Sequence, residues 1–147
     1  GNSGLTPAER RRRVGAYYEP FRDALAAEIA RKADPVLVTI HSFTPVYHGK
    51  ARAVEIGVLH DADSRLADAI LDVADRYDVQ RNAPYGPEDG VTHTLKLHAL
   101  PDGRLNVMIE IRNDLIRSEA AEEAMAETLS AWVARALDSL GVGACRV

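Results

Sequence analysis

Two blocks of the sequence hold side chains that could carry out hydrolytic chemistry. The block TIHSFTP, residues 39–45, contains His41 directly after an apolar run, and LNVMIEI, residues 105–111, contains Glu110 and is followed by Arg112. An imidazole can bind a metal ion, a carboxylate can act as a general base, and a guanidinium binds a carboxylate through two parallel hydrogen bonds. These three side chains would form a hydrolytic site if the fold brings them together.

Each of these side chains also has a structural explanation. A lone histidine near a strand is often a core residue whose ring nitrogens bond to the backbone, and one ligand does not define a metal site. An ionised carboxylate such as Glu110 is costly inside an apolar strand unless it is paired. Arg112 follows on the same face of the strand but about 6–7 Å away, so it does not obviously pair with Glu110, although a structural ion pair between the two remains open.

The elements that must position these residues include three helices, which are indicated by apolar residues at spacings of three and four. The segment TPAE, residues 6–9, has the form of a capping box with proline in the first turn. It predicts a long helix over about 7–32, bent at Pro20. The other two helices are expected over about 64–76 and about 118–140.

Short apolar runs predict the strands. Residues 36–40 are rich in β-branched side chains and predict a strand buried on both faces. Residues 82–90 are rich in Pro, Gly, Asn and Asp and predict a loop of defined shape, whereas residues 91–100 fit either a helix or a strand. Further strands are expected at 54–59, at 105–111 and, on a weaker pattern, at 78–81.

The alternation of helices and strands predicts an α/β fold, a three-layer α/β/α sandwich around a mixed, mostly parallel sheet. In open sheets of this kind, ligands bind outside the carboxyl ends of the strands. His41 and Glu110 lie at two such strand ends. With 147 residues, of which 46% are hydrophobic, the chain is expected to form a single domain over 1–147.

Composition narrows the classes of function and partner. A formal charge of -4 gives no general attraction to nucleic acid or to an anionic membrane, so neither is expected as a partner. The single cysteine, Cys145, excludes an internal disulfide framework and a cysteine-rich metal site, and it fits a reducing cytoplasm. No apolar stretch approaches the ~18 residues needed to cross a bilayer, so a soluble cytoplasmic protein is expected.

Several blocks, in the order in which they occur, resemble the N-formylglutamate amidohydrolase family. They are HSFTPVYHG, IGVLHDAD, NAPYGPEDGVTHTLKLHA and VMIEIRNDLIRSE, preceded by the opening GNSGLTPAERRRRVGAYYEPF. The resemblance covers nearly the whole chain and corresponds to the C-terminal half of the family's domain. That family is similar in turn to the zinc carboxypeptidases, so the resemblance implies part of a phosphorylase/hydrolase-like zinc carboxypeptidase architecture.

The resemblance implies a role for each chemical group. His41 would be a zinc ligand, and Glu110 would take a proton from zinc-bound water during hydrolysis of an amide. Arg112 would bind a substrate carboxylate or the developing oxyanion. The residues expected to contact the substrate are Ser42, Asn82, Tyr85 and Thr92.

His41 cannot hold zinc by itself, since a catalytic zinc usually has three protein ligands and an open position for water. In the family, the other two ligands lie in the first half of the domain, before the point at which this sequence begins. The remaining histidines lie on different expected elements, and no pair has the spacing of a known zinc block; they are His48, His60, His93 and His98. We therefore expect either a fragment of a longer enzyme or a shortened relative.

Two functions of different classes follow from the sequence. The first is zinc-dependent hydrolysis of a small N-acyl amino acid, most like the conversion of N-formyl-L-glutamate to formate and L-glutamate. The second is a non-catalytic α/β remnant, a binding or assembly module that keeps His41 and Glu110 for structural reasons. In either case a strand edge or an apolar sheet face without its covering half favours self-association, so a homo-oligomer is expected.

Overall fold

A computed structural model describes residues 4–142 of the chain. Its backbone contacts divide the chain into two compact units, residues 1–35 and residues 36–147. The expectation of one domain over residues 1–147 stays a prediction. Within the described residues, no helix is both long enough and apolar enough to cross a membrane.

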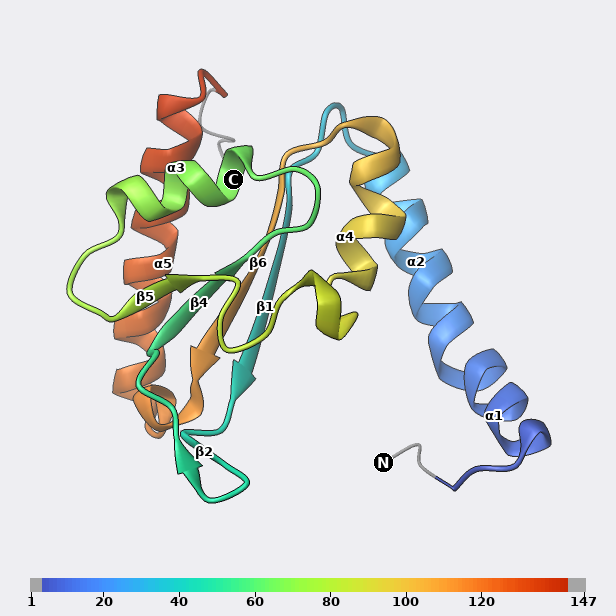
Figure 1. The fold of residues 1–147 in the computed structure, drawn as a ribbon. Helices are drawn as coiled ribbons and strands as arrows, with labels where there is room; N and C mark the ends of the chain where they lie inside the picture. The colour runs from blue at the N-terminus through green and yellow to red at the C-terminus, as the bar shows by residue number, and fades with distance from the viewer. Residues whose placement is uncertain (1–3, 143–147) are drawn as a thin grey trace. The chain divides into compact units, whose positions relative to one another are not determined.

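The first unit is a single helical rod (Figure 1) made of α1 (Pro7–Arg13), a π-helical turn η1 (Val14–Tyr18) and α2 (Glu19–Ala30). Its start is a complete capping box, since the Thr6 hydroxyl accepts from the Glu9 N–H at 3.3 Å and the Glu9 carboxylate accepts from the Thr6 N–H at 2.9 Å. The predicted helix over 7–32 is therefore confirmed to within two residues at its end.

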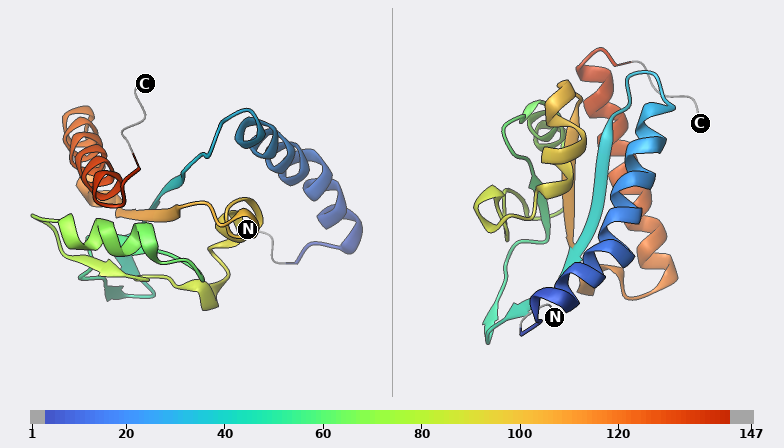
Figure 2. Two further views of the ribbon diagram at one scale, coloured as in Figure 1. Left: turned by 90° about the horizontal axis from the view of Figure 1, so that it is seen from above. Right: turned by 90° about the vertical axis from the view of Figure 1, so that its right-hand side faces the viewer.

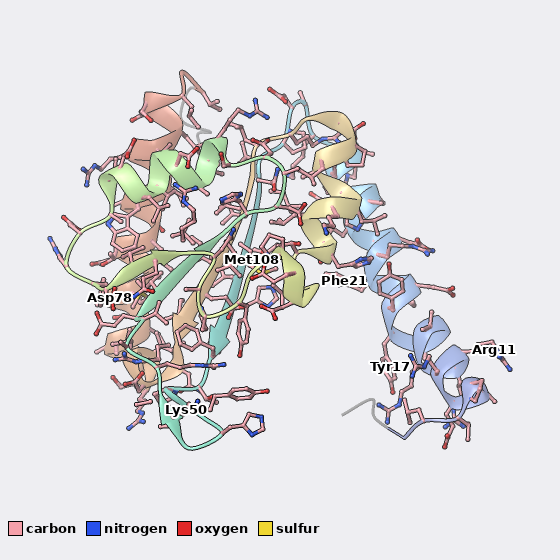
Figure 3. All side chains as sticks on the ribbon, viewed as in Figure 1. Arg11, Tyr17, Phe21, Lys50, Asp78 and Met108 are labelled. Atoms are coloured by element: carbon pink, nitrogen blue, oxygen red, sulfur yellow. The ribbon has the colours of Figure 1, made fainter. Side chains whose placement is uncertain are left out.

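A wide π-helical turn, η1, lies just before Pro20, where the sequence predicts a bend. A proline inside a helix removes one N–H donor and crowds the preceding turn, and a π-helical turn is one way to accommodate that change. None of the residues of this unit's helix is buried, and Tyr17 and Phe21 are 75% and 60% exposed. Both lie on the same rod in Figure 3.

The second unit is built on a four-stranded sheet in the order β1-β6-β4-β5. β1 pairs with β6 in parallel, β4 pairs with β5 in parallel, and β4 pairs with β6 in antiparallel fashion. The sheet is thus mixed and mostly parallel, as the sequence predicts. The strands are β1 (Leu37–Phe43), β4 (Ile56–Leu59), β5 (Val79–Arg81) and β6 (Asn106–Arg112).

The prediction that the first strand is buried on both faces is wrong. Among residues 4–142, β1 pairs only with β6 and forms an edge of the sheet. Its residues 37–39 are half-buried, residues 40–42 are exposed, and Ile40 is 53% exposed. An apolar run indicates a strand that packs against apolar residues, but it does not show whether the strand lies inside the sheet or at its edge.

Helices cover both faces of this sheet, which gives the three layers of the predicted sandwich (Figures 1 and 2). Helices α3 (Arg65–Val73) and α5 (Glu119–Ser139) share one core cluster with the sheet, around the fully buried Ile56, Val58 and Val107. The short α4 (His93–His98) packs Leu95 on the other face, against Leu59 and Met108. The stretch whose pattern fits either type of element is therefore a helix.

A hairpin that the sequence analysis did not anticipate follows β1. Its strands, β2 (Val46–Tyr47) and β3 (Lys50–Ala51), are joined through His48 and Gly49, both at positive φ. Two central residues at positive φ are the signature of the tight hairpin turn that matches strand twist. Lys50 marks this hairpin in Figure 3. Short 3-10 turns complete the unit at Pro87–Asp89, Leu100–Asp102 and Asn113–Ile116.

Candidate active site

His41 and Glu110 lie directly opposite each other in the parallel pair of β1 and β6. Because facing residues of neighbouring strands point to the same side of a sheet, the imidazole and the carboxylate share one face. That face is the one covered by α4, since Met108, two residues before Glu110, packs against Leu95. Met108 is labelled at the centre of the sheet in Figure 3. The two residues that could do chemistry are therefore brought together.

The environment of Glu110 is unusual for a carboxylate. Its side chain is 6% exposed, and its Oε2 atom is buried without a hydrogen-bond partner among the described residues. Burial raises the pKa of Glu110, and the nearby side chains of His41 and Arg52 act in the opposite direction without cancelling that effect. A buried carboxyl with a raised pKa and a free oxygen has the properties of a general base.

Arg112 does not form the structural ion pair with Glu110 that the sequence left open. Its Nε donates to Asp114 at 2.8 Å, and its Nη2 lies 3.5 Å from a carboxylate oxygen of Glu55. Its Nη1 donates to the carbonyl of Ala53 at 2.9 Å and to that of Arg52 at 3.3 Å. Arg112 thus holds the segment before β4 in place, and contact with a substrate carboxylate stays a prediction that this geometry does not favour.

Arg52 is a charged residue near Glu110 that the sequence analysis missed. Its guanidinium carbon lies 4.6 Å from the centre of the Tyr47 ring and 5.0 Å from that of Tyr85. The signal available in the sequence was a basic residue between an aromatic-rich block and an apolar strand, which carries no information about position in space. Only the turn of the hairpin β2–β3 brings Arg52 back toward the end of β1.

The three loop residues expected to touch substrate have different surroundings. The Asn82 side chain accepts from the backbone N–H of His60 at 2.9 Å, and the fully buried Thr92 hydroxyl donates to Asp61 at 2.6 Å. Both side chains therefore have structural partners. Tyr85 is half-buried beside Arg52, whose charge acts on Glu110, so the structure places its ring near the candidate base. Their contacts with substrate stay predictions.

Ser42 lies on the opposite face of the sheet from His41, because neighbouring residues of a strand alternate between faces. It is the register partner of Ile111, whose side chain belongs to the core under α5. The structure does not bring Ser42 to the face that holds Glu110. An open apolar groove of about 620 Å³ lies on this second face, lined in part by Ile40 and Val133. Such a groove favours self-association, but the homo-oligomer stays a prediction.

A glycine opposite Glu110 lets the loop after β5 lie directly on the sheet. Gly57 is the register partner of Glu110 in the pair of β4 and β6. A Cβ atom at Gly57 would overlap the carbonyl oxygen of Ala83, so only glycine allows this approach. The close contact fixes the start of the loop that carries Tyr85 next to the candidate base.

The residues that could bind a metal ion are few. Across residues 4–142, no group of three or more His, Cys, Asp and Glu side chains is arranged to hold one. His41 offers an exposed imidazole, and the free oxygen of Glu110 is suited to accept a proton from a nearby water. These two groups fit part of a catalytic zinc site, which requires two further protein ligands.

The sequence profile of the N-formylglutamate amidohydrolase family matches residues 2–117. The chain belongs to the N-formylglutamate amidohydrolase family. A solved structure, the gene product Atu2144 from Agrobacterium tumefaciens, is 57% identical with a TM-score of 0.91, over 95% of this chain and 58% of that one. A search of curated protein sequences finds no match.

The N-formylglutamate amidohydrolase from Ralstonia eutropha JMP134 has the same fold at lower similarity. It is 23% identical with a TM-score of 0.57, over 91% of this chain and 54% of that one. The chain therefore spans little more than half the length of either solved structure. The family match agrees with the resemblance seen in the sequence, and the shared fold agrees with the predicted α/β architecture.

Proposed function

We propose that the protein hydrolyses the amide bond of an N-acyl amino acid, as in the conversion of N-formyl-L-glutamate to formate and L-glutamate. The observation that carries this proposal is the pairing of His41 with Glu110 across β1 and β6, on one face of the sheet. Membership of the amidohydrolase family supports the choice of an amide as the bond that is broken.

Glu110 acts as the general base in this proposal. Its free Oε2 accepts a proton from the attacking water as the water oxygen bonds to the carbonyl carbon. The same carboxyl then gives the proton to the departing amine nitrogen as the C–N bond breaks, so the group returns to its ionised form. The raised pKa caused by burial suits both halves of this transfer, because a base poised closer to neutral pH can also act as the acid.

His41 acts as one ligand of a zinc ion. When bound, zinc lowers the pKa of the attacking water to ~7 and polarises the amide carbonyl. A complete zinc site needs two more protein ligands, and residues 4–142 hold no group of three or more His, Cys, Asp and Glu side chains arranged to bind a metal ion.

The test uses the protein as its gene encodes it, with and without the substitution His41→Ala. Release of formate from N-formyl-L-glutamate is measured together with zinc content by mass spectrometry. We expect turnover with about one zinc per active site in the native protein, and loss of both in the variant. A native protein that binds no zinc and releases no formate would instead support the binding-module alternative.

A further inference from the structure

Arg52 presents a cation whose orientation is fixed by aromatic rings from three separate segments. Besides Tyr47 and Tyr85, the ring of Phe43 lies 5.5 Å from the guanidinium carbon, and Phe43 itself is only 3% exposed. Aromatic faces attract a guanidinium and restrict its position. The rings come from β1, from β2 and from the loop after β5, so the packing of three segments determines where this charge lies.

Hydrogen bonds also hold Arg52 on both its backbone and its side chain. Its backbone N–H donates to the carbonyl of Pro45 at 2.8 Å, and its own carbonyl accepts from Nη1 of Arg112 at 3.3 Å. Its side-chain Nη1 donates to the carbonyl of Thr44 at 3.2 Å. A group held in this way loses little freedom when it binds a ligand, which favours affinity.

The charge of Arg52 has no ionic partner of its own within the part of the chain that the structure describes. Arg112, by contrast, pairs with both Glu55 and Asp114. A guanidinium carries five N–H donors, and the bond to Thr44 uses one of them. Arg52 is half-buried and close enough to Glu110 to act on its charge. A fixed cation with donors to spare beside the candidate base is suited to an anionic ligand.

We propose that Arg52 binds the carboxylate of the N-acyl amino acid and so places the amide bond at Glu110. This inference rests on the proposed amide hydrolysis and adds the group that selects acidic substrates. A guanidinium matches a carboxylate through two parallel hydrogen bonds, a geometry that fixes orientation as well as position. The role falls to Arg52 rather than Arg112, because the donors of Arg112 are engaged by carbonyls and carboxylates of the chain itself.

The first experiment measures binding without turnover. Calorimetry with L-glutamate, the proposed product, is carried out on the native protein and on Arg52→Gln, Arg52→Lys and Arg135→Ala. Arg135 is an exposed arginine of α5 and serves as the charge-matched control. We expect about 10–100-fold weaker binding for Arg52→Gln, a smaller loss for Arg52→Lys, and no change for Arg135→Ala. Equal affinity in all four proteins, or no binding by the native one, overturns the proposal.

The second experiment compares N-formyl-L-glutamate with its uncharged diamide as substrates. The native protein is expected to have a higher kcat/KM for the dicarboxylate than for the diamide. In Arg52→Gln, kcat/KM should fall for the dicarboxylate and stay unchanged for the diamide. An equal fall in kcat/KM for both substrates would mean that Arg52 acts on the reacting carbonyl, and it overturns the proposal. If Arg52→Gln melts below the assay temperature, Arg52→Lys is judged by the same criteria.

The two experiments separate this inference from the function on which it rests. A native protein that binds L-glutamate through Arg52 but hydrolyses no N-acyl amino acid contradicts the amidohydrolase proposal and leaves the carboxylate site standing. A native protein that hydrolyses N-formyl-L-glutamate with the same KM as Arg52→Gln contradicts the carboxylate site and leaves the amidohydrolase proposal standing.

Discussion

His41 on β1 and Glu110 on β6 are register partners in a parallel strand pair, and both side chains lie on the face of the sheet covered by α4. Neighbouring strands are about 4.8 Å apart, so backbone hydrogen bonds alone keep these two positions within reach of one small molecule. The register extends unbroken from Leu37 and Asn106 to Phe43 and Arg112. Their proximity is therefore a property of the sheet and not of mobile loops.

Replacement of the candidate base should remove activity without removing the fold. We predict that Glu110→Gln lowers kcat by about 10²–10⁴-fold, because the amide keeps the size of the side chain but cannot take a proton from water. Zinc content should be unchanged. The matched control is Glu123→Gln, an exposed glutamate of α5, which should retain full activity. Retention of kcat in Glu110→Gln would remove Glu110 from the role of base.

The buried charge of Glu110 should also affect stability in a pH-dependent way. Burial raises the folded-state pKa of Glu110, so its contribution to stability is complete at low pH and is lost as the pH rises through that pKa. The native protein treated with chelator should therefore lose stability relative to Glu110→Gln between about pH 4, the ordinary range of a glutamate, and neutral pH. Thermal melting at several pH values measures this difference. A difference that is the same at every pH would contradict the raised pKa.

Thr92 is predicted to stabilise the fold through Asp61. Burial opposes the ionisation of Asp61, but hydrogen bonds from Thr92 and Lys96 outweigh it and lower the pKa of this carboxyl. Thr92→Val leaves the carboxylate without one donor and should lower stability at pH 7 by about 1–3 kcal/mol, whereas Thr92→Ser keeps the hydroxyl and should restore most of it.

The pH dependence of the Thr92→Val effect follows from the sign of the Asp61 shift. Because the pKa of Asp61 is lower in the folded protein, its ionised carboxylate stabilises the fold at pH values above the ordinary aspartate pKa of about 3.9. This stabilisation is lost as the pH falls through the pKa of Asp61 in the folded protein. The gap between the native protein and Thr92→Val should therefore narrow in acid. Denaturant unfolding at pH 7 and below pH 4 tests this, and an unchanged stability at pH 7 would show that the hydroxyl has no structural role.

Gly57 should tolerate no side chain. A Cβ atom there would overlap the backbone carbonyl of Ala83, which cannot move as easily as a flexible side chain. Gly57→Ala should cost about 1–3 kcal/mol of stability and displace the loop that carries Tyr85, so that KM rises as well. Gly15→Ala is the control, because the nearest atom to its added methyl is a flexible carboxylate at 3.6 Å. Equal melting temperatures for the two variants would contradict the close contact at Gly57.

Local patterns predicted most of the elements because they depend on neighbours in the chain. The capping box at Thr6, the stripe of α5 and the apolar run of β6 each appear within a few residues of their expected places. The hairpin at His48 and Gly49 was missed, since its strands have two residues each and show no alternation. Short elements leave too little pattern to distinguish them from a loop.

The sequence predicted only those residues of the candidate site that stand out by their position in an apolar strand. His41 and Glu110 were found because each ends or interrupts an apolar run, yet their adjacency depends on the order of strands, which no single run encodes. For the same reason the sequence did not single out Arg52, and it predicted for Arg112 a contact with the substrate rather than with Glu55 and Asp114. Which guanidinium meets a carboxylate of the protein depends on contacts between residues far apart in the chain, such as Arg112 and Glu55, which are 57 positions apart.

The central claim is that His41 and Glu110 work together in one hydrolytic site, and a double-mutant cycle on kcat/KM for N-formyl-L-glutamate tests it most directly. Substitutions of residues that act as a unit have strongly non-additive effects on kcat/KM. Once one of the two residues is lost, replacing the other should therefore change kcat/KM little. We predict that His41→Ala combined with Glu110→Gln is about as impaired as the worse of the two single variants. Losses that multiply, so that each substitution has the same effect with or without the other, would contradict a shared site.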